Sequence, residues 1–170
     1  KTDIPMPVIG QDELENLPPP LKVKRNHDAE VDHDSILWPL DANDNQIKYM
    51  RAHYMANVEM IDLQIGKIMD TLQTKGYLDN AIVIFTTDHG DCLGDHGLTQ
   101  KWSMYEEVVH VPLIINSQGR FKGGSTIDAM VQLHDLAPTI LEWAGVEQAY
   151  SMEAHSLNQA LLGGEFPGRE

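Results

Sequence analysis

The sequence contains 170 residues, and its 26 acidic and 12 basic residues give a net charge of −14 at pH 7. This acidic balance excludes a general nucleic-acid-binding protein, because such proteins need a basic face. No apolar run approaches the roughly 18 residues that span a membrane. The single cysteine, Cys92, excludes an intrachain disulfide and leaves the redox compartment open.

The first 45 residues show little hydrophobic periodicity. Pro5, Pro7 and the proline run 18–20 favour extended backbone, because proline fixes its own φ and restricts the residue before it. We therefore predict that residues 1–45 form a loop-rich segment that wraps the domain. Residues 46–163 would form the domain itself, and residues 164–170 a tail.

A long helix is predicted next. Apolar residues recur at alternating spacings of three and four, which is the period of one buried helical stripe. The stripe consists of Ile47, Met50, Tyr54, Val58, Ile61, Ile65, Ile68 and Leu72. Asp44 or Asn45 can cap the start of the helix, and Gly76 can end it in a left-handed conformation. The stripe is most simply core.

Two short apolar runs follow this helix, at residues 81–85 and 111–115. The first is rich in β-branched residues and predicts a strand buried on both faces, as in a parallel sheet. A second helix is predicted at residues 134–145, where Asp135 can serve as the cap, and a last helical turn at residues 156–163. Helices alternating with buried strands indicate an α/β fold with a mostly parallel sheet.

The loop that leaves the first strand is the best candidate for a functional site, because ligands bind at the carboxyl ends of strands in open α/β sheets. Asp88 and His89 follow the strand directly, and a carboxylate beside an imidazole suits a divalent cation such as Ca²⁺, Mg²⁺, Mn²⁺ or Zn²⁺. A turn in which Asp88 binds local backbone amides explains the tripeptide alone more simply.

Two further residues beyond this pair are candidates for contact with a substrate. The tripeptide Asp-His-Gly recurs at residues 95–97, which makes His96 a candidate on the substrate side. Lys101 follows closely, and a lysine ammonium can hold one oxygen of a sulfate or phosphate. The alternatives are that the second tripeptide only shapes the loop and that Lys101 is an ordinary solvated lysine.

Several segments in order resemble the sulfatases of the alkaline-phosphatase superfamily. The resemblance begins in the helix around residues 54–68 and continues through the strand and its Thr-Asp-His-Gly exit at residues 82–91. It then follows the block from Leu93 to Lys101, the Tyr-Glu-Glu and Val-Pro-Leu-Ile-Ile segments, the helix at residues 135–141 and the Ser-Leu and Leu-Leu-Gly segments near residue 160. Each motif is weak alone, but the ordered set is specific.

The resemblance implies the fold and the chemistry of the parent enzyme. It implies an alkaline-phosphatase-like sandwich around a mostly parallel sheet, incomplete in this chain. Asp88 and His89 would bind one divalent ion, usually calcium, and Lys101 would bind the sulfate oxygens. The family nucleophile is a formylglycine made within a Cys/Ser-x-Pro/Ala-x-Arg motif, and Cys92 does not lie in such a motif. That residue, with further metal ligands, is expected upstream of Lys1.

We therefore interpret residues 46–163 as the C-terminal part of a sulfatase catalytic domain whose parent hydrolyses a sulfated small molecule or carbohydrate. The isolated chain would be inactive without the missing N-terminal half of the same enzyme. A metal-dependent phosphoesterase or phosphonate monoester hydrolase of the same superfamily is one alternative. A non-catalytic fragment that acts only as a structural partner is another. The resemblance favours a periplasmic or secreted location over the cytoplasm, although the sequence itself leaves the compartment open.

Overall fold

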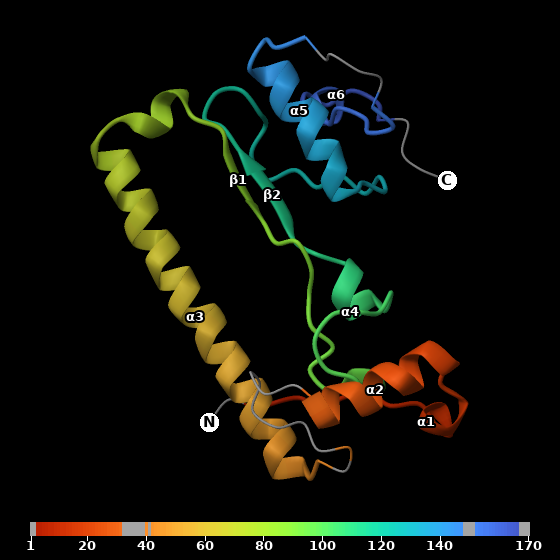
Figure 1. The fold of residues 1–170 in the computed structure, drawn as a ribbon. Coiled ribbons are helices and arrows are strands. Elements are labelled where there is room, and N and C mark those ends of the chain that lie inside the picture. The colour runs from red at the N-terminus through yellow and green to blue at the C-terminus, as the bar shows by residue number, and fades with distance from the viewer. Residues whose placement is uncertain (1–2, 32–39, 41, 148–151, 167–170) are drawn as a thin grey trace. The chain divides into compact units, whose positions relative to one another are not determined.

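A computed structural model describes residues 3–31, 40, 42–147 and 152–166 of the chain (Figure 1). The described helices and strands are α1 (Glu13–Asn16), α2 (Pro19–Val31), α3 (Asp44–Thr74), β1 (Val83–Thr86), α4 (Glu106–Val109), β2 (Leu113–Asn116), α5 (Leu136–Trp143) and α6 (Asn158–Leu161). Three short 3-10 turns join them, η1 (Tyr77–Asn80), η2 (Asp95–Gly97) and η3 (Leu133–Asp135). The chain divides into two compact units. The first contains residues 1–74 and 86–113, and the second contains residues 75–85 and 114–170.

The long predicted helix is present as α3. Its start is capped by Asn43, whose Oδ1 accepts hydrogen bonds from the backbone N–H groups of Asn45 at 3.0 Å and Gln46 at 3.1 Å. The prediction that Asp44 or Asn45 caps the helix was therefore wrong by one or two residues. Gly76 follows the helix with a φ of 70°, as predicted, and this left-handed conformation suits a residue without a Cβ.

The apolar stripe of α3 is not buried as the sequence predicted. Val58, Ile61 and Ile68 are 53%, 50% and 57% exposed. The one buried residue of the helix is instead the charged Arg51. The periodicity of the stripe was interpreted correctly, but these three side chains remain exposed in the described part of the chain.

The N-terminal segment is more helical than its prolines suggested. The helix α2 begins at Pro19, because the first turn of a helix tolerates residues that lack a free N–H. Leu21 of α2 packs against a small buried cluster that contains Cys92, Leu98 and Val108. The expected extended run at 18–20 is therefore a helix start, whereas residues 3–10 contain no regular structure. Residues 32–39, 41 and 167–170, which belong to the predicted segment and tail, lie outside the described residues.

The second unit contains most of the two-stranded β1–β2 sheet and the helices α5 and α6. The strands appear where the sequence predicted them, within one or two residues. They are not buried on both faces, since Phe85 is 40% and Ile114 60% exposed. As in α3, these apolar side chains remain partly exposed in the described part of the chain. The expected sheet is therefore represented by two strands of the described chain.

The helix α5 is anchored by two buried polar side chains. The Thr139 hydroxyl donates to the carbonyl oxygen of Asp135 at 2.5 Å, and its oxygen accepts the N–H of Leu157 at 2.8 Å. The Asp135 carboxylate accepts the N–H groups of Gln132 at 2.8 Å and His155 at 2.9 Å. Asp135 therefore does not cap α5 with its side chain as predicted. It stabilises the preceding 3-10 turn and holds the segment that leads to α6.

None of the helices in the described ranges is long and apolar enough to cross a membrane.

Candidate active site

The loop from Thr87 to Lys101, here called the site loop, begins with the predicted pair of metal ligands. Oδ2 of Asp88 lies 3.6 Å from Nε2 of His89. Nδ1 of His89 lies 2.7 Å from the carbonyl oxygen of Gly90. A carbonyl oxygen can only accept, so Nδ1 carries the proton, and in the neutral ring Nε2 offers its lone pair. A metal-binding histidine commonly donates its other ring N–H in this way.

The spacing of the two groups fits two ligands of one divalent cation. Ligands at the usual calcium–oxygen distances occupy neighbouring positions about 3.4 Å apart. The Asp88 carboxylate is 82% exposed and the His89 ring 35%, so both remain accessible to an ion. The described residues contain no group of three or more His, Cys, Asp or Glu side chains that could hold a metal ion. The pair therefore suits part of a coordination sphere.

The surroundings of Asp88 favour its ionised form. Desolvation raises the pKa of Asp88, but the backbone N–H groups of Asp88 and His89 and the electrostatic interactions with His89 and Lys101 outweigh this and lower it. The N–H of His89 donates to Oδ1 of Asp88 at 3.1 Å. A carboxylate must be deprotonated to bind a metal, so this environment favours that state. The positive charge of Lys101 is one of the influences that lower this pKa.

Asp91 brings Lys101 back towards the start of the loop. Oδ1 of Asp91 accepts the N–H groups of Leu93 at 2.8 Å and Gln100 at 3.0 Å. The N–H of Cys92 donates to the carbonyl oxygen of Gln100 at 3.1 Å. These bonds join residues 91 and 92 to residue 100 and so close this part of the site loop. Lys101, which follows Gln100, is thereby brought back close to residues 91 and 92.

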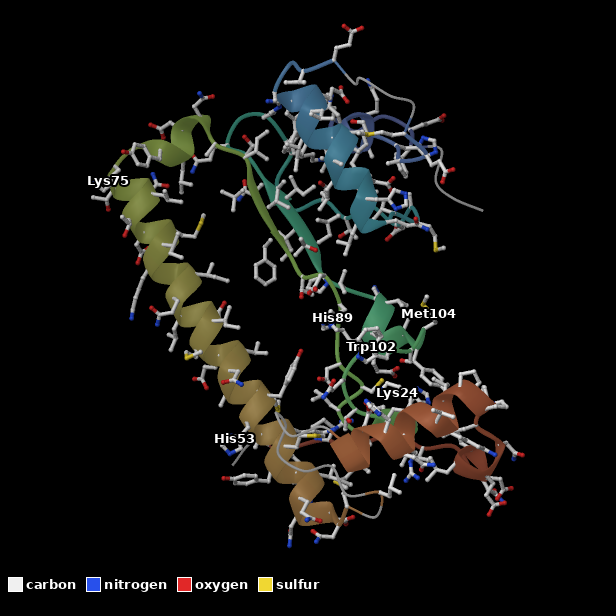
Figure 2. All side chains as sticks on the ribbon, in the orientation of Figure 1. Lys24, His53, Lys75, His89, Trp102 and Met104 are labelled. Atoms are coloured by element: carbon white, nitrogen blue, oxygen red, sulfur yellow. The ribbon has the colours of Figure 1, made fainter. Side chains whose placement is uncertain are left out.

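Lys101 lies between two residues with left-handed backbone. Gln100 has a φ of 60° and Trp102 a φ of 50°, which is unusual for residues with a bulky side chain. Trp102 is 73% and Met104 89% exposed (Figure 2). The Lys101 ammonium makes no hydrogen bond or ion pair within the ranges that the structure describes. It is therefore available to an oxyanion.

Three basic side chains from α2 and α3 hold the middle of the site loop through its carbonyl oxygens. Arg51 donates to Leu93 at 2.9 Å, Arg25 to Gly97 at 3.0 Å and Lys24 to Thr99 at 2.7 Å. Sequence reasoning missed all three. Arg51 could have been found, because it lies three residues before Tyr54 and four after Ile47, in register with the apolar stripe of α3.

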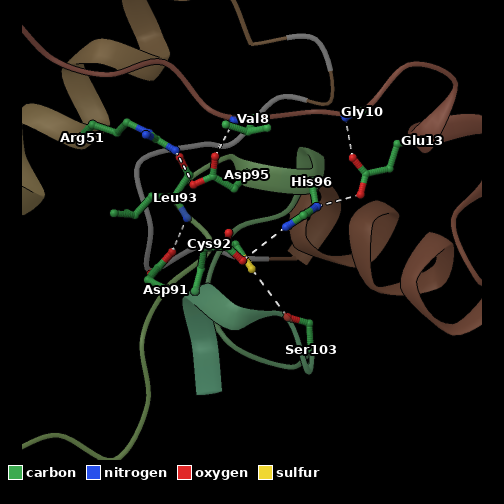
Figure 3. A network of polar contacts seen from close by, with 11 residues as sticks. Val8, Gly10, Glu13, Arg51, Asp91, Cys92, Leu93, Asp95, His96 and Ser103 are labelled. Atoms are coloured by element: carbon green, nitrogen blue, oxygen red, sulfur yellow. Dashed lines mark hydrogen bonds and ion pairs between the residues drawn. The ribbon is translucent and has the colours of Figure 1, made fainter. Parts of the chain in front are cut away.

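The second tripeptide is held by contacts within the chain. Oδ2 of Asp95 lies 2.6 Å from Nη2 of Arg51, and Oδ1 accepts the N–H of Val8 at 2.5 Å (Figure 3). The His96 ring has one carboxylate at each nitrogen, Glu13 at 2.7 Å and Glu107 at 3.2 Å. The sequence placed His96 with Lys101 in contact with a substrate. In the structure its polar atoms face the chain's own side chains.

Comparison with known proteins places this loop in a family. The sulfatase family model matches residues 16–146. An N-acetylglucosamine-6-O-sulfatase from Bacteroides thetaiotaomicron is 42% identical over 114 residues, which cover 67% of this chain and 20% of that protein. The chain therefore spans about a fifth of this curated relative.

Solved structures support the same assignment. A phosphonate monoester hydrolase from Silicibacter pomeroyi matches with a TM-score of 0.83 and 29% identity over 100% of this chain and 33% of that one. A protein solved in complex with its substrate D-glucosamine-2-N,6-O-disulfate matches with a TM-score of 0.66 and 39% identity over 72% of this chain and 25% of that one. These matches confirm the predicted α/β fold of the alkaline-phosphatase superfamily, incomplete in this chain. The chain is a member of the sulfatase family.

Proposed function

We propose that the protein to which this chain belongs hydrolyses sulfate esters, and that this chain supplies two metal ligands and a sulfate-binding lysine. The observation that carries the proposal is the site loop itself. In a chain that matches the sulfatase family over residues 16–146, one closed loop presents a carboxylate, an imidazole and an ammonium group. An anionic ester needs positive charge at its reacting group, and a cation together with a lysine supplies it in an otherwise acidic chain.

Each residue has a distinct role in this proposal. Asp88 and His89 would hold a divalent cation, which when bound polarises an ester oxygen and neutralises charge. Nδ1 of His89 donates its proton to the Gly90 carbonyl oxygen, which would leave the Nε2 lone pair to bind the cation. Lys101 would bind an oxygen of the sulfate group and stabilise the negative charge that develops in the transition state. Calcium is the ion that we propose, by resemblance to the family.

The nucleophile is proposed to be a formylglycine supplied by another part of the protein. Cys92 does not fill this role. It is fully buried, its Sγ lies 3.6 Å from the Ser103 hydroxyl, and burial raises the pKa of its thiol. A protonated, inaccessible thiol is a poor nucleophile and a poor substrate for modification.

A sulfated carbohydrate is the proposed substrate class. The relative from Bacteroides thetaiotaomicron is named as an N-acetylglucosamine-6-O-sulfatase, and the solved complex contains a disulfated glucosamine. Both share about 40% of their residues with this chain over the matched region. We therefore propose a sulfated amino sugar as the first substrate to test.

Phosphonate monoester hydrolysis is a second candidate. It is favoured by the phosphonate monoester hydrolase structure, which matches this chain along its whole length with a TM-score of 0.83. The same cation and the same lysine can bind the oxygens of either group, because both are tetrahedral oxyanions. The site loop alone therefore does not separate the two reactions.

A parallel assay of the full-length protein separates them. The purified protein is stripped of metal, reloaded with Ca²⁺, Mn²⁺ or Zn²⁺, and given 4-nitrophenyl sulfate, glucosamine 6-sulfate and a phenylphosphonate monoester. We expect the sulfate esters to be hydrolysed with the higher kcat/KM in the presence of Ca²⁺. Faster hydrolysis of the phosphonate ester would replace the proposal with the second candidate.

The Lys101→Ala variant should lose most activity, whereas Lys75→Ala, which changes an exposed lysine beyond the end of α3, should retain it.

A further inference from the structure

The His96 side chain connects three separate parts of the first unit. Its Nδ1 lies 2.7 Å from Oε1 of Glu13 in α1, and its Nε2 lies 3.2 Å from Oε2 of Glu107 in α4. The ring also stacks on Tyr105, with the two centroids 3.7 Å apart and the planes 6° from parallel. Glu13 lies 83 residues away in the sequence, so the contact is a long-range tie (Figure 3).

The two carboxylate contacts indicate the protonation state of the His96 ring. An ionised carboxylate can only accept, so each of the two contacts requires an N–H on the ring. A ring that donates from both nitrogens is an imidazolium, which suits the two negative charges beside it. Glu13 of α1 and Glu107 of α4 face the two ring nitrogens, and the titratable Tyr105, in the segment before α4, stacks on the face of the ring. Neither ring nitrogen is then left to donate to a substrate or to accept a proton from one.

The Glu107 contact reaches the proposed metal ligands through the backbone. The N–H of Gly90 donates to the carbonyl oxygen of Val108 at 2.9 Å. A Cβ added at Gly90 would lie only 1.9 Å from the carbonyl oxygen of Glu107, so α4 packs directly on this glycine. Gly90 in turn accepts the Nδ1 proton of His89. The His96–Glu107 bond therefore holds α4 against the residue that orients His89.

The Glu13 contact fixes the other side of the loop. The second oxygen of Glu13 accepts the N–H of Gly10 at 2.6 Å. The backbone N–H of His96 donates to the carbonyl oxygen of Val8 at 3.0 Å. His96 has a φ of 58°, so the turn is held in a conformation that a free loop would rarely adopt. Residues 8–13 and the site loop thus meet at His96, through its backbone N–H and through its ring.

We infer that His96 is a positioning residue, an imidazolium that links Glu13 to Glu107 and thereby fixes the loop that carries Asp88, His89 and Lys101. This gives His96 a role different from the substrate contact that the sequence suggested. The effect on catalysis rests on the proposed function, whereas the state of the ring does not. The two parts can therefore be tested separately.

The state of the ring is tested by NMR of the full-length protein with ¹⁵N-labelled histidine. The His96 signals are assigned by their loss in His96→Asn, a variant chosen because Asn tolerates left-handed backbone. We expect both ring nitrogens of His96 to be protonated near neutral pH. In the Glu13→Gln/Glu107→Gln double variant the ring should become neutral at the same pH. A wild-type ring with one bare nitrogen would overturn the inference, whether or not the enzyme turns over.

The effect on catalysis is tested with a series of aryl sulfates whose leaving groups differ in pKa. If His96 only positions the loop, His96→Asn should lower kcat/KM by about 10–100-fold, as expected for residues that orient metal ligands, and by the same factor for every ester. Glu107→Gln should give a loss of similar size, and the His96→Asn/Glu107→Gln double variant should be little worse than either single variant.

A loss confined to esters with poor leaving groups would identify His96 as a proton donor and overturn the inference. A wild-type protein inactive on every sulfate ester would instead contradict the proposed function and leave the NMR result to decide the state of the ring.

Discussion

Arg51 and Asp95 form an ion pair in which Nη2 and Oδ2 are 2.6 Å apart and both side chains are largely buried, at 11% and 16% exposure. The same guanidinium also donates to the carbonyl oxygens of Leu93 at 2.9 Å and Pro5 at 3.1 Å. One side chain of α3 thus joins the site loop to the N-terminal segment. Arg51 therefore links the long helix directly to the candidate active site.

Arg51→Ala should destabilise the full-length protein by about 3 kcal/mol, because it leaves the Asp95 charge buried without its partner. Arg51→Lys should recover only part of this, since an ammonium cannot reproduce the fork of donors. Chemical denaturation of each variant measures the loss. Lys48→Ala changes an exposed position of the same helix and should stay within about 0.5 kcal/mol of the wild type. Equal effects for Arg51→Ala and Lys48→Ala would show that the pair contributes no stability.

Asp88→Asn should weaken binding of the divalent cation by about 100-fold or more, because even residues that only orient a ligand contribute 10–100-fold. Asp91→Asn is the matched control. Its Oδ1 can still accept the N–H groups of Leu93 and Gln100, so the loop stays closed. Isothermal titration with Ca²⁺ compares the two variants of the full-length protein. A greater loss for Asp91→Asn than for Asp88→Asn would contradict the assignment of Asp88 as a ligand.

The Glu13 carboxylate should make stability depend on pH in the acid range. The N–H of Gly10 lowers the pKa of Glu13 most, partial burial raises it, and His96 lowers it further, so its net pKa lies below the ordinary value of 4.5. A carboxylate whose pKa is lowered by folding stabilises the folded state when the pH is above the ordinary pKa of that group. This contribution is lost as the pH falls through the lowered pKa of the folded state. Denaturation midpoints between neutral pH and about pH 3 should therefore fall less steeply in Glu13→Gln than in the wild type. The exposed neighbour Glu15 provides the control, since Glu15→Gln should leave the slope unchanged.

Gly90→Ala should disrupt the contact between α4 and the site loop. The new Cβ would lie 1.9 Å from the Glu107 carbonyl oxygen, a backbone atom that cannot rotate away. We expect a loss of about 3 kcal/mol, typical of overpacking, together with weaker cation binding. Gly123→Ala is the control, because nothing lies within 4 Å of the Cβ that it would add. Thermal denaturation of both variants checks the prediction, and a Gly90→Ala protein as stable as Gly123→Ala would refute it.

The sequence predicted the elements with strong local signals. The alternating spacing of apolar residues located α3, and the β-branched run located β1. The Gly76 helix end was also correct, because a left-handed residue after a helix has few alternatives to glycine. By contrast, α2 was not predicted. The three prolines at residues 18–20 indicated extended backbone, although the helix begins at the second of them.

The contacts that build the site could not be read from local patterns. Glu13 meets His96 across 83 residues and Arg51 meets Asp95 across 44, and no periodicity connects such positions. Burial was also overestimated for α3 and β1. Periodicity reports that an apolar face exists, and the face is covered only if a partner is present. The two matched solved structures are each about three times as long as this chain.

The left-handed backbone at Gln100 and Trp102 has a consequence for how this loop can change. Glycine would adopt the same angles without steric cost, so Gln100→Gly or Trp102→Gly would relieve local strain. The relieved backbone would also sample a wider range of angles, and the ammonium of Lys101 would spread over more positions. A substitution at this turn that raises thermal stability should therefore lower the turnover rate.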